Sequence, residues 1–172
     1  MTIDIFKNIF LFFLMILLQV LVLNNIQFSG YINPFLYVLF ILMLPFEAPK
    51  WLVLFASFLI GLGMDMFSDS IGIHAAASTF MGFCRPYVLN IIKPRDGYEF
   101  NTQPTIRDMD VRWYITYSGI LVFLHHFVFF YIEIFRINEF FSILTRVVLS
   151  SFFTILLIIL AQLLFTSSRK TS

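Results

Sequence analysis

Long apolar stretches separated by short polar breaks recur along the whole chain. A helix needs about 20 predominantly apolar residues to cross the hydrocarbon core of a bilayer. Six segments approach or exceed that length, the second and third being short: residues 5–23, 31–46, 51–67, 71–92, 113–135 and 140–165. The pattern therefore predicts an all-α, integral membrane six-helix bundle. We expect a single transmembrane domain, residues 1–172, with one longer polar loop at 93–112.

The composition supports this class. Hydrophobic residues make up 60% of the chain and charged residues 12%, whereas about a quarter of a typical soluble domain is charged. The first apolar segment lacks a small-residue cleavage site, so we interpret it as an uncleaved span. The chain has no nucleophile elbow, no glycine-rich phosphate loop and no H-E-x-x-H motif. We expect no catalytic residues, no metal, no cofactor and no nucleic-acid partner.

Basic residues fall almost entirely on one side of the predicted membrane. The side that holds both termini carries eight of them: Lys7, Lys50, Lys93, Arg95, Arg107, Arg112, Arg169 and Lys170. The opposite connections carry only Arg136. Because Lys and Arg favour the cytoplasmic side, we expect both termini and the 93–112 loop to be cytoplasmic. Thr105 and Asp108 have the spacing of a helix start inside that loop.

Four ionisable side chains are expected at one depth, in the outer half of the membrane: Asp65, His74, Glu133 and Arg146. Ionised groups are costly in hydrocarbon, so these should face protein and pair. We favour a pair between Asp65 and Arg146, within a network that fixes helix register. A ligand site or a proton path is the alternative interpretation.

Three further polar residues lie inside predicted spans. His125 and His126 point about 100° apart on a helix, so they do not form a helical metal-binding pair, and we expect one of them to face the core and form a hydrogen bond. We expect Arg85 to extend its charged end to the cytoplasmic interface.

Small residues gather where the third and fourth segments meet, and such residues let helices approach closely in lipid. They are Gly61, Gly63, Ala75, Ala76, Ser78 and Gly82. We predict a tight helical hairpin with its turn at residues 68–70. Asp69 and Ser70 are expected to cap the helix that follows.

The same region carries a resemblance to a known family. The run Gly61-Leu62-x-x-Asp65-x-Phe67-x-x-Ser70-x-Gly72-x-His74-Ala75, together with His125-His126 followed by Glu133-x-Phe135, resembles MreD, the rod shape-determining membrane protein of bacteria. The length and the short-looped spans resemble that family as well. The resemblance implies that Gly61, Asp65, Gly72 and His74 form a partner-binding or structural motif.

The resemblance also implies a function. MreD-like proteins are non-enzymatic scaffolds of the cell-elongation machinery in the bacterial inner membrane, and they bind the single-span protein MreC. MreB, RodA and a penicillin-binding protein belong to the same complex, and membrane lipid surrounds it. Their fold resembles the substrate-binding subunits of energy-coupling-factor vitamin transporters. Two other classes stay open: such a transporter subunit, with a ligand held by the outer polar cluster and Tyr31, and a lipid-processing membrane enzyme.

Overall fold

The computed structural model describes residues 2–25, 32–68, 70–99, 102–135 and 139–167. Helices dominate these residues, and no β-strand occurs among them. The all-α prediction is therefore confirmed. Five helices are long: α1 (Thr2–Leu21), α3 (Lys50–Phe67), α4 (Ile73–Ile91), α6 (Val111–Ile134) and α7 (Phe140–Ser167). The others are short: η1 (Leu23–Asn25), η2 (Leu36–Val38), α2 (Leu39–Leu42) and α5 (Ile106–Met109).

Four of the six predicted segments have the length and composition of membrane-spanning helices. They are Phe6–Asn25, Lys50–Phe67, Val111–Ile134 and Phe140–Leu164. This is the pattern of a multi-pass membrane protein. The fourth predicted segment, 71–92, contains α4, which is also long but carries the buried polar residues His74, Ser78 and Arg85.

The second predicted segment, 31–46, is not one spanning helix, so this part of the prediction is wrong. Residues 33–35 lack helical structure, η2 and α2 follow, and α2 ends at Leu42 before Pro45. Two prolines explain the break. Pro34 disfavours a helical conformation at Asn33, and Pro45 has no N–H with which to continue a helix.

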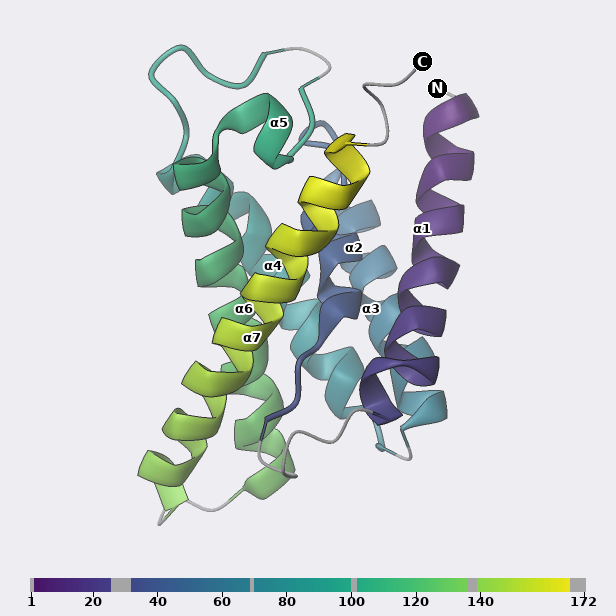
Figure 1. The fold of residues 1–172 in the computed structure, drawn as a ribbon, viewed down its shortest axis with the longest axis vertical. Coiled ribbons are helices and arrows are strands. Elements are labelled where there is room, and N and C mark those ends of the chain that lie inside the picture. The colour runs from purple at the N-terminus through teal and green to yellow at the C-terminus, as the bar shows by residue number, and fades with distance from the viewer. Residues whose placement is uncertain (1, 26–31, 69, 100–101, 136–138, 168–172) are drawn as a thin grey trace.

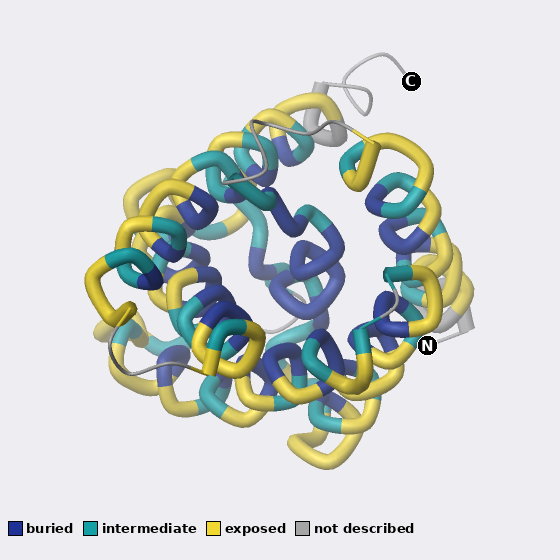
Figure 2. The backbone as a smooth tube through the Cα atoms, turned by 90° about the horizontal axis from the view of Figure 1, so that it is seen from below, coloured by how far each residue is buried: buried dark blue, intermediate teal, exposed yellow. Residues whose placement is uncertain are grey.

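The long helices form a ring around this broken segment. Figure 1 shows that α1 begins and α7 ends at the same end of the bundle, where the 93–112 loop also lies; we call this the loop end. Figure 2 shows the ring from below with a buried coil at its centre, and residues 37–42 of the broken segment are all buried. In the ring, α4 packs on both α3 and α6, and α6 packs on α7.

Side chains of the ring helices satisfy the irregular backbone at the start of the broken segment. Gln19 of α1 accepts a hydrogen bond from the N–H of Leu36 (2.7 Å) and donates one to the carbonyl of Pro34 (3.0 Å). From α7, Thr154 accepts from the N–H of Phe35 at 3.0 Å. Buried backbone groups away from water need such partners, and irregular backbone at membrane depth is tolerated only inside protein.

At its other end the broken segment is held by Tyr117 and Arg85. The Tyr117 hydroxyl donates to the carbonyl of Leu42 at 3.1 Å, and the Arg85 guanidinium donates to the carbonyl of Leu44 and to the Tyr117 oxygen. Arg85 is only 2% exposed. The expectation that Arg85 reaches the membrane interface is therefore wrong, because the carbonyls released where α2 ends require a buried donor.

The described residues of the connection between α4 and α6, 92–99 and 102–110, pack against the bundle. Thr105 caps α5 by accepting from the N–H of Asp108, which confirms the predicted helix start. Tyr98 donates to the carbonyl of Leu89 at 2.7 Å and stacks on Phe46. Burial raises the pKa of Tyr98 further above neutrality, and the protonated hydroxyl donates this hydrogen bond at neutral pH.

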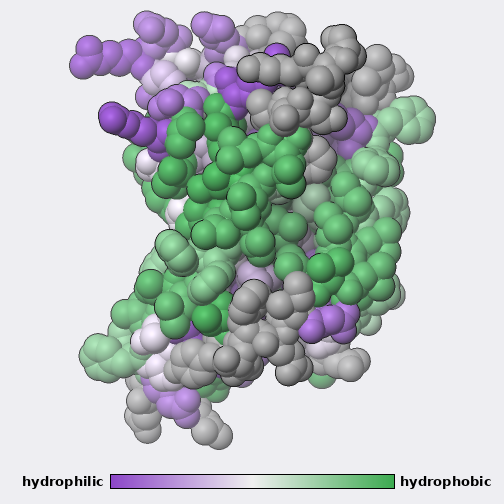
Figure 3. Space-filling model, in the orientation of Figure 1, coloured by the Kyte–Doolittle hydropathy of each residue, from purple (hydrophilic) through white to green (hydrophobic). Residues whose placement is uncertain are grey.

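The surface has the hydrophobic distribution of a protein embedded in a bilayer. Figure 3 shows a broad apolar surface over the middle of the molecule, with hydrophilic side chains concentrated at the loop end. Large apolar side chains of the long helices are exposed, including Phe10, Phe55 and Leu164, which are 67%, 58% and 73% exposed. Such a surface is stable in lipid and not in water.

Candidate functional site

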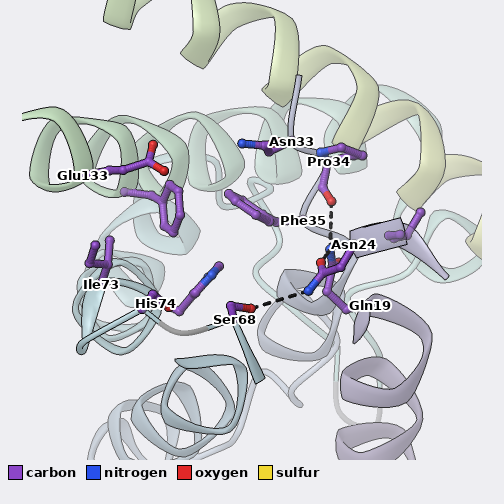
Figure 4. A pocket seen from close by; sticks show the side chains of 12 residues that line it. Gln19, Asn24, Asn33, Pro34, Phe35, Ser68, Ile73, His74 and Glu133 are labelled. Atoms are coloured by element: carbon purple, nitrogen blue, oxygen red, sulfur yellow. Dashed lines mark hydrogen bonds between the residues drawn. The ribbon is translucent and has the colours of Figure 1, made fainter. Parts of the chain in front are cut away.

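A polar pocket of about 400 Å³ opens at the end of the bundle opposite the loop end. Figure 4 shows side chains from α1, the broken segment, the α3–α4 connection, α4 and α6 around it. Its apolar floor includes Phe35 and Phe129. Its polar lining is Gln19, Asn24, Asn33, Ser68, Ser70, His74 and Glu133. The predicted convergence of His74 and Glu133 is thus seen in one cavity.

Asp65 does not pair with Arg146; it caps α4 from the neighbouring helix. One carboxylate oxygen accepts from the N–H of His74 (3.0 Å) and the other from the N–H of Ala75 (2.9 Å). The Ser70 hydroxyl donates to the first oxygen at 2.6 Å. Asp65 is 7% exposed. The predicted Asp65–Arg146 pair is wrong because the free N–H groups of α4 compete for the carboxylate and lie closer.

The sequence around the turn explains why a distant carboxylate takes this role. The residue before α4 is Gly72, whose φ of 78° is left-handed and which has no side chain to cap the helix. The first N–H groups of a helix carry partial positive charge and favour an anion. Ser70, predicted as a cap itself, instead positions Asp65, and Asp69 lies outside the described residues.

Close helix packing brings Asp65 within reach of α4. At Gly61 an added Cβ would lie 2.5 Å from the carbonyl oxygen of His74 and 2.6 Å from the Cα of Ala75. Only glycine allows this approach. The predicted tight hairpin is therefore present, and Gly61 and Asp65 act within it as structural residues.

Arg146 contacts the other carboxylate predicted at this depth. Its guanidinium lies 3.8 Å from a carboxylate oxygen of Glu133 and 5.0 Å from the centre of the Phe130 ring. The two charged side chains are 18% and 37% exposed. Partly exposed ion pairs of this length contribute little to stability in water. Glu133 also lines the pocket and is 37% exposed, so its carboxylate is accessible from the cavity while it contacts Arg146.

Behind the pocket, the Tyr37 hydroxyl joins two histidines. It lies 3.0 Å from Nδ1 of His74 and 2.7 Å from Nε2 of His125, and Ser78 donates to it at 3.3 Å. A phenol has one proton and two acceptor positions, so one histidine accepts from Tyr37 and the other donates to it. All three hydrogen-bonding capacities of the hydroxyl are used.

The hydrogen-bond network assigns the histidine tautomers. Nδ1 of His125 is buried and has no partner among the described residues. A buried N–H without a partner is rarer than a bare acceptor, so we place the His125 proton on Nε2, from which it donates to Tyr37. Tyr37 then donates to Nδ1 of His74. The proton of His74 consequently sits on Nε2, and the pocket-lining imidazole keeps an N–H to offer.

His126 serves the broken segment. Its Nδ1 lies 2.8 Å from the carbonyl of Val122, and its Nε2 lies 3.1 Å from the hydroxyl of Thr154, which also accepts from Phe35. Both adjacent histidines are thus buried and hydrogen-bonded, where the sequence predicted only one. Across the described parts of the chain, no group of three or more His, Cys, Asp or Glu side chains is placed to hold a metal ion.

Gln19 and Tyr37, the two side chains that organise the site, are not among the site residues predicted from the sequence. A glutamine inside an unbroken apolar run was the signal for Gln19, because a polar amide in lipid must find partners. Tyr37 had no comparable signal. Comparison with models of protein families, with curated proteins and with solved structures returned no match. The site's chemistry is that of a binding pocket, with amide, hydroxyl and imidazole donors beside one accessible carboxylate.

Proposed function

We propose that this protein is a non-enzymatic scaffold of the bacterial cell-elongation machinery, which holds an MreC-like single-span protein in the inner membrane. The chain would cross the membrane six times, with the loop end cytoplasmic. The second crossing is the broken segment, and α4 is another. The resemblance of the Gly61–Ala75 run to MreD motivates the proposal, and the basic residues at the loop end support its orientation.

One observation carries the proposal: an apolar groove on the lipid-facing side of the α3–α4 hairpin. It has a volume of about 650 Å³. Its small residues are Gly72, directly before α4, and Ala75 and Ala76 in α4, and its larger ones lie on both helices: Phe58, Leu62 and Phe80. Small residues in such a groove let the backbone of a partner helix approach closely, which is the main source of affinity between helices in lipid.

Two of the four motif residues touch surfaces that a partner would meet. Gly72 lines the groove, and His74 lines the polar pocket at the same end of the hairpin. A helix in the groove would leave the membrane beside this pocket. Polar groups in the emerging segment of the partner would then meet His74 and Glu133.

A substitution in the groove tests the proposal. Ala76 is exposed in the groove, so Ala76→Leu should block a partner helix without disturbing the core. Gly119→Leu on α6 is the matched control, because an added Cβ there meets nothing within 4 Å. In a rod-shaped host, Ala76→Leu should lose the MreC-like protein in pulldown from mild detergent and give rounded cells, while Gly119→Leu should retain both. Equal capture by the two variants contradicts the proposal.

The polar pocket favours a second candidate function, the substrate-binding subunit of a vitamin transporter. A cavity of about 400 Å³ is within the usual size of small-molecule sites, and its amides, imidazole and carboxylate suit a polar ligand. The two functions differ in what copurifies. A bound vitamin together with an ATPase pair, in a host that keeps normal rods after depletion, would establish the transporter instead.

A further inference from the structure

A second cavity, of about 360 Å³, lies at the loop end and plays no part in the proposed scaffold function. Its walls come from the first half of α1, the turn after α2, the 103–108 segment and the last part of α7. Figure 1 shows α1 and α5 on either side of the loop end. We call it the basic cavity. The basic cavity lies where the apolar surface meets the hydrophilic end of the molecule. Lipid headgroups would lie at this depth in a bilayer.

The wall of the basic cavity on the side towards the middle of the membrane is apolar. It is formed by Phe10, Leu11 and Leu14 of α1 and by Met43. Phe10 is 67% exposed, and the outward face of α1 continues as apolar side chains at Leu17 and Leu21. An acyl chain that entered along Phe10 would therefore remain in contact with hydrocarbon side chains along α1.

The rim of the basic cavity carries two cations that have no ion pair with any described residue. They are Lys7 of α1 and Arg107 of α5, and both are exposed. The one carboxylate in the lining, Asp108, already accepts from the N–H of Gln103 at 3.1 Å. The rim thus has a net positive charge. A guanidinium and an ammonium facing one space suit a phosphate group, to which Arg binds in a bidentate manner.

We propose that the basic cavity binds one membrane phospholipid with an anionic headgroup. The phosphate would lie between Lys7 and Arg107, with an acyl chain against Phe10 and Leu14. Basic pockets between membrane helices on the cytoplasmic side bind anionic headgroups in this way. The net positive rim selects phosphatidylglycerol over phosphatidylcholine, because the choline cation offsets the phosphate charge. The apolar wall selects a lipid over free phosphate.

Native mass spectrometry of the full-length protein in mild detergent tests this inference. The probes are phosphatidylglycerol, phosphatidylcholine and inorganic phosphate, added separately. The rim variant, Lys7→Gln/Arg107→Gln, removes both cations of the cavity rim. The control variant, Lys93→Gln/Arg95→Gln, removes two exposed cations that lie at the same end but outside the cavity. The rim variant should bind phosphatidylglycerol at least about tenfold more weakly, since each basic residue near anionic lipid contributes roughly fivefold. The control should stay within about twofold.

Each other outcome overturns the inference. Equal weakening in both double variants would mean diffuse attraction to basic residues and no site. If phosphatidylcholine bound as tightly as phosphatidylglycerol, the net charge of the rim would not determine binding. If inorganic phosphate bound as tightly as the lipid, the apolar wall would not contribute. Because all four substituted residues are exposed, equal thermal midpoints without lipid check that the variants are folded. The result is independent of MreC-like capture, so the two proposals fail separately.

Discussion

Asp65→Ala should be among the most destabilising single substitutions in this chain. The carboxylate accepts three hydrogen bonds, from the N–H groups of His74 (3.0 Å) and Ala75 (2.9 Å) and from Ser70 (2.6 Å). His74 and Ala75 are 4% and 5% exposed, so their N–H groups would have no water to replace Asp65. Each buried donor left without a partner costs about 1–3 kcal/mol. We expect a total loss of about 3–5 kcal/mol in the free energy of unfolding.

The assay is reversible unfolding in mixed micelles, followed by the fluorescence of Trp51 and Trp113. Asp65→Asn should lose roughly half as much as Asp65→Ala, because the amide keeps one acceptor oxygen. Glu133→Gln is the control, with an expected loss below about 1 kcal/mol for a partly exposed pair. The effects of Asp65→Ala and Arg146→Gln should add within about 0.5 kcal/mol. A loss below about 1 kcal/mol for Asp65→Ala, or strong coupling to Arg146, would refute this assignment.

Three further predictions concern the packing and the orientation of the chain. Gln19→Leu should cost about 2–4 kcal/mol in the same assay, because the Pro34 carbonyl and the N–H groups of Leu36 and Tyr37 lose their side-chain partner; an unchanged stability would show that water replaces it. Gly61→Ala should destabilise more than Gly63→Ala, since the added Cβ meets backbone at 2.5 Å in the first case and the flexible end of Ile16 at 2.8 Å in the second, and equal midpoints would contradict this. A cysteine at Ser68 should react with a membrane-impermeant thiol reagent in intact cells, whereas one at Thr102 should not; labelling at Thr102 alone would reverse the orientation.

The sequence predicted the long helices and the hairpin well, for physical reasons. Apolar runs in lipid have few alternatives to helix, so α1, α3, α6 and α7 fall close to their predicted bounds. The break in the second segment was readable in part from Pro34 and Pro45. Its irregular course was not, because it depends on side chains of α1, α4, α6 and α7 that reach the freed backbone groups.

The polar residues show where such prediction stops. Depth along a helix placed His74 and Glu133 in one zone, and they do line one pocket. Depth alone could not choose the partner of Asp65: the sequence predicted that the first N–H groups of α4 need a cap but favoured the adjacent Asp69 and Ser70, whereas the close packing of α3 on α4 brings Asp65 to them. Arg85 was misjudged because its partner is the carbonyl of Leu44. In each case a backbone group decided where a charged side chain lies.

The most direct test of the scaffold proposal is photocrosslinking in living cells from a photoreactive amino acid at Ala76, in the α3–α4 groove. The matched control carries the same group at Gly119 on α6, outside the groove. The proposal predicts one main product at Ala76, identified by mass spectrometry as a single-span protein with a large periplasmic part, and none of it at Gly119. Equal crosslinking from both positions, or a main product at Ala76 that is a transporter subunit, would contradict it.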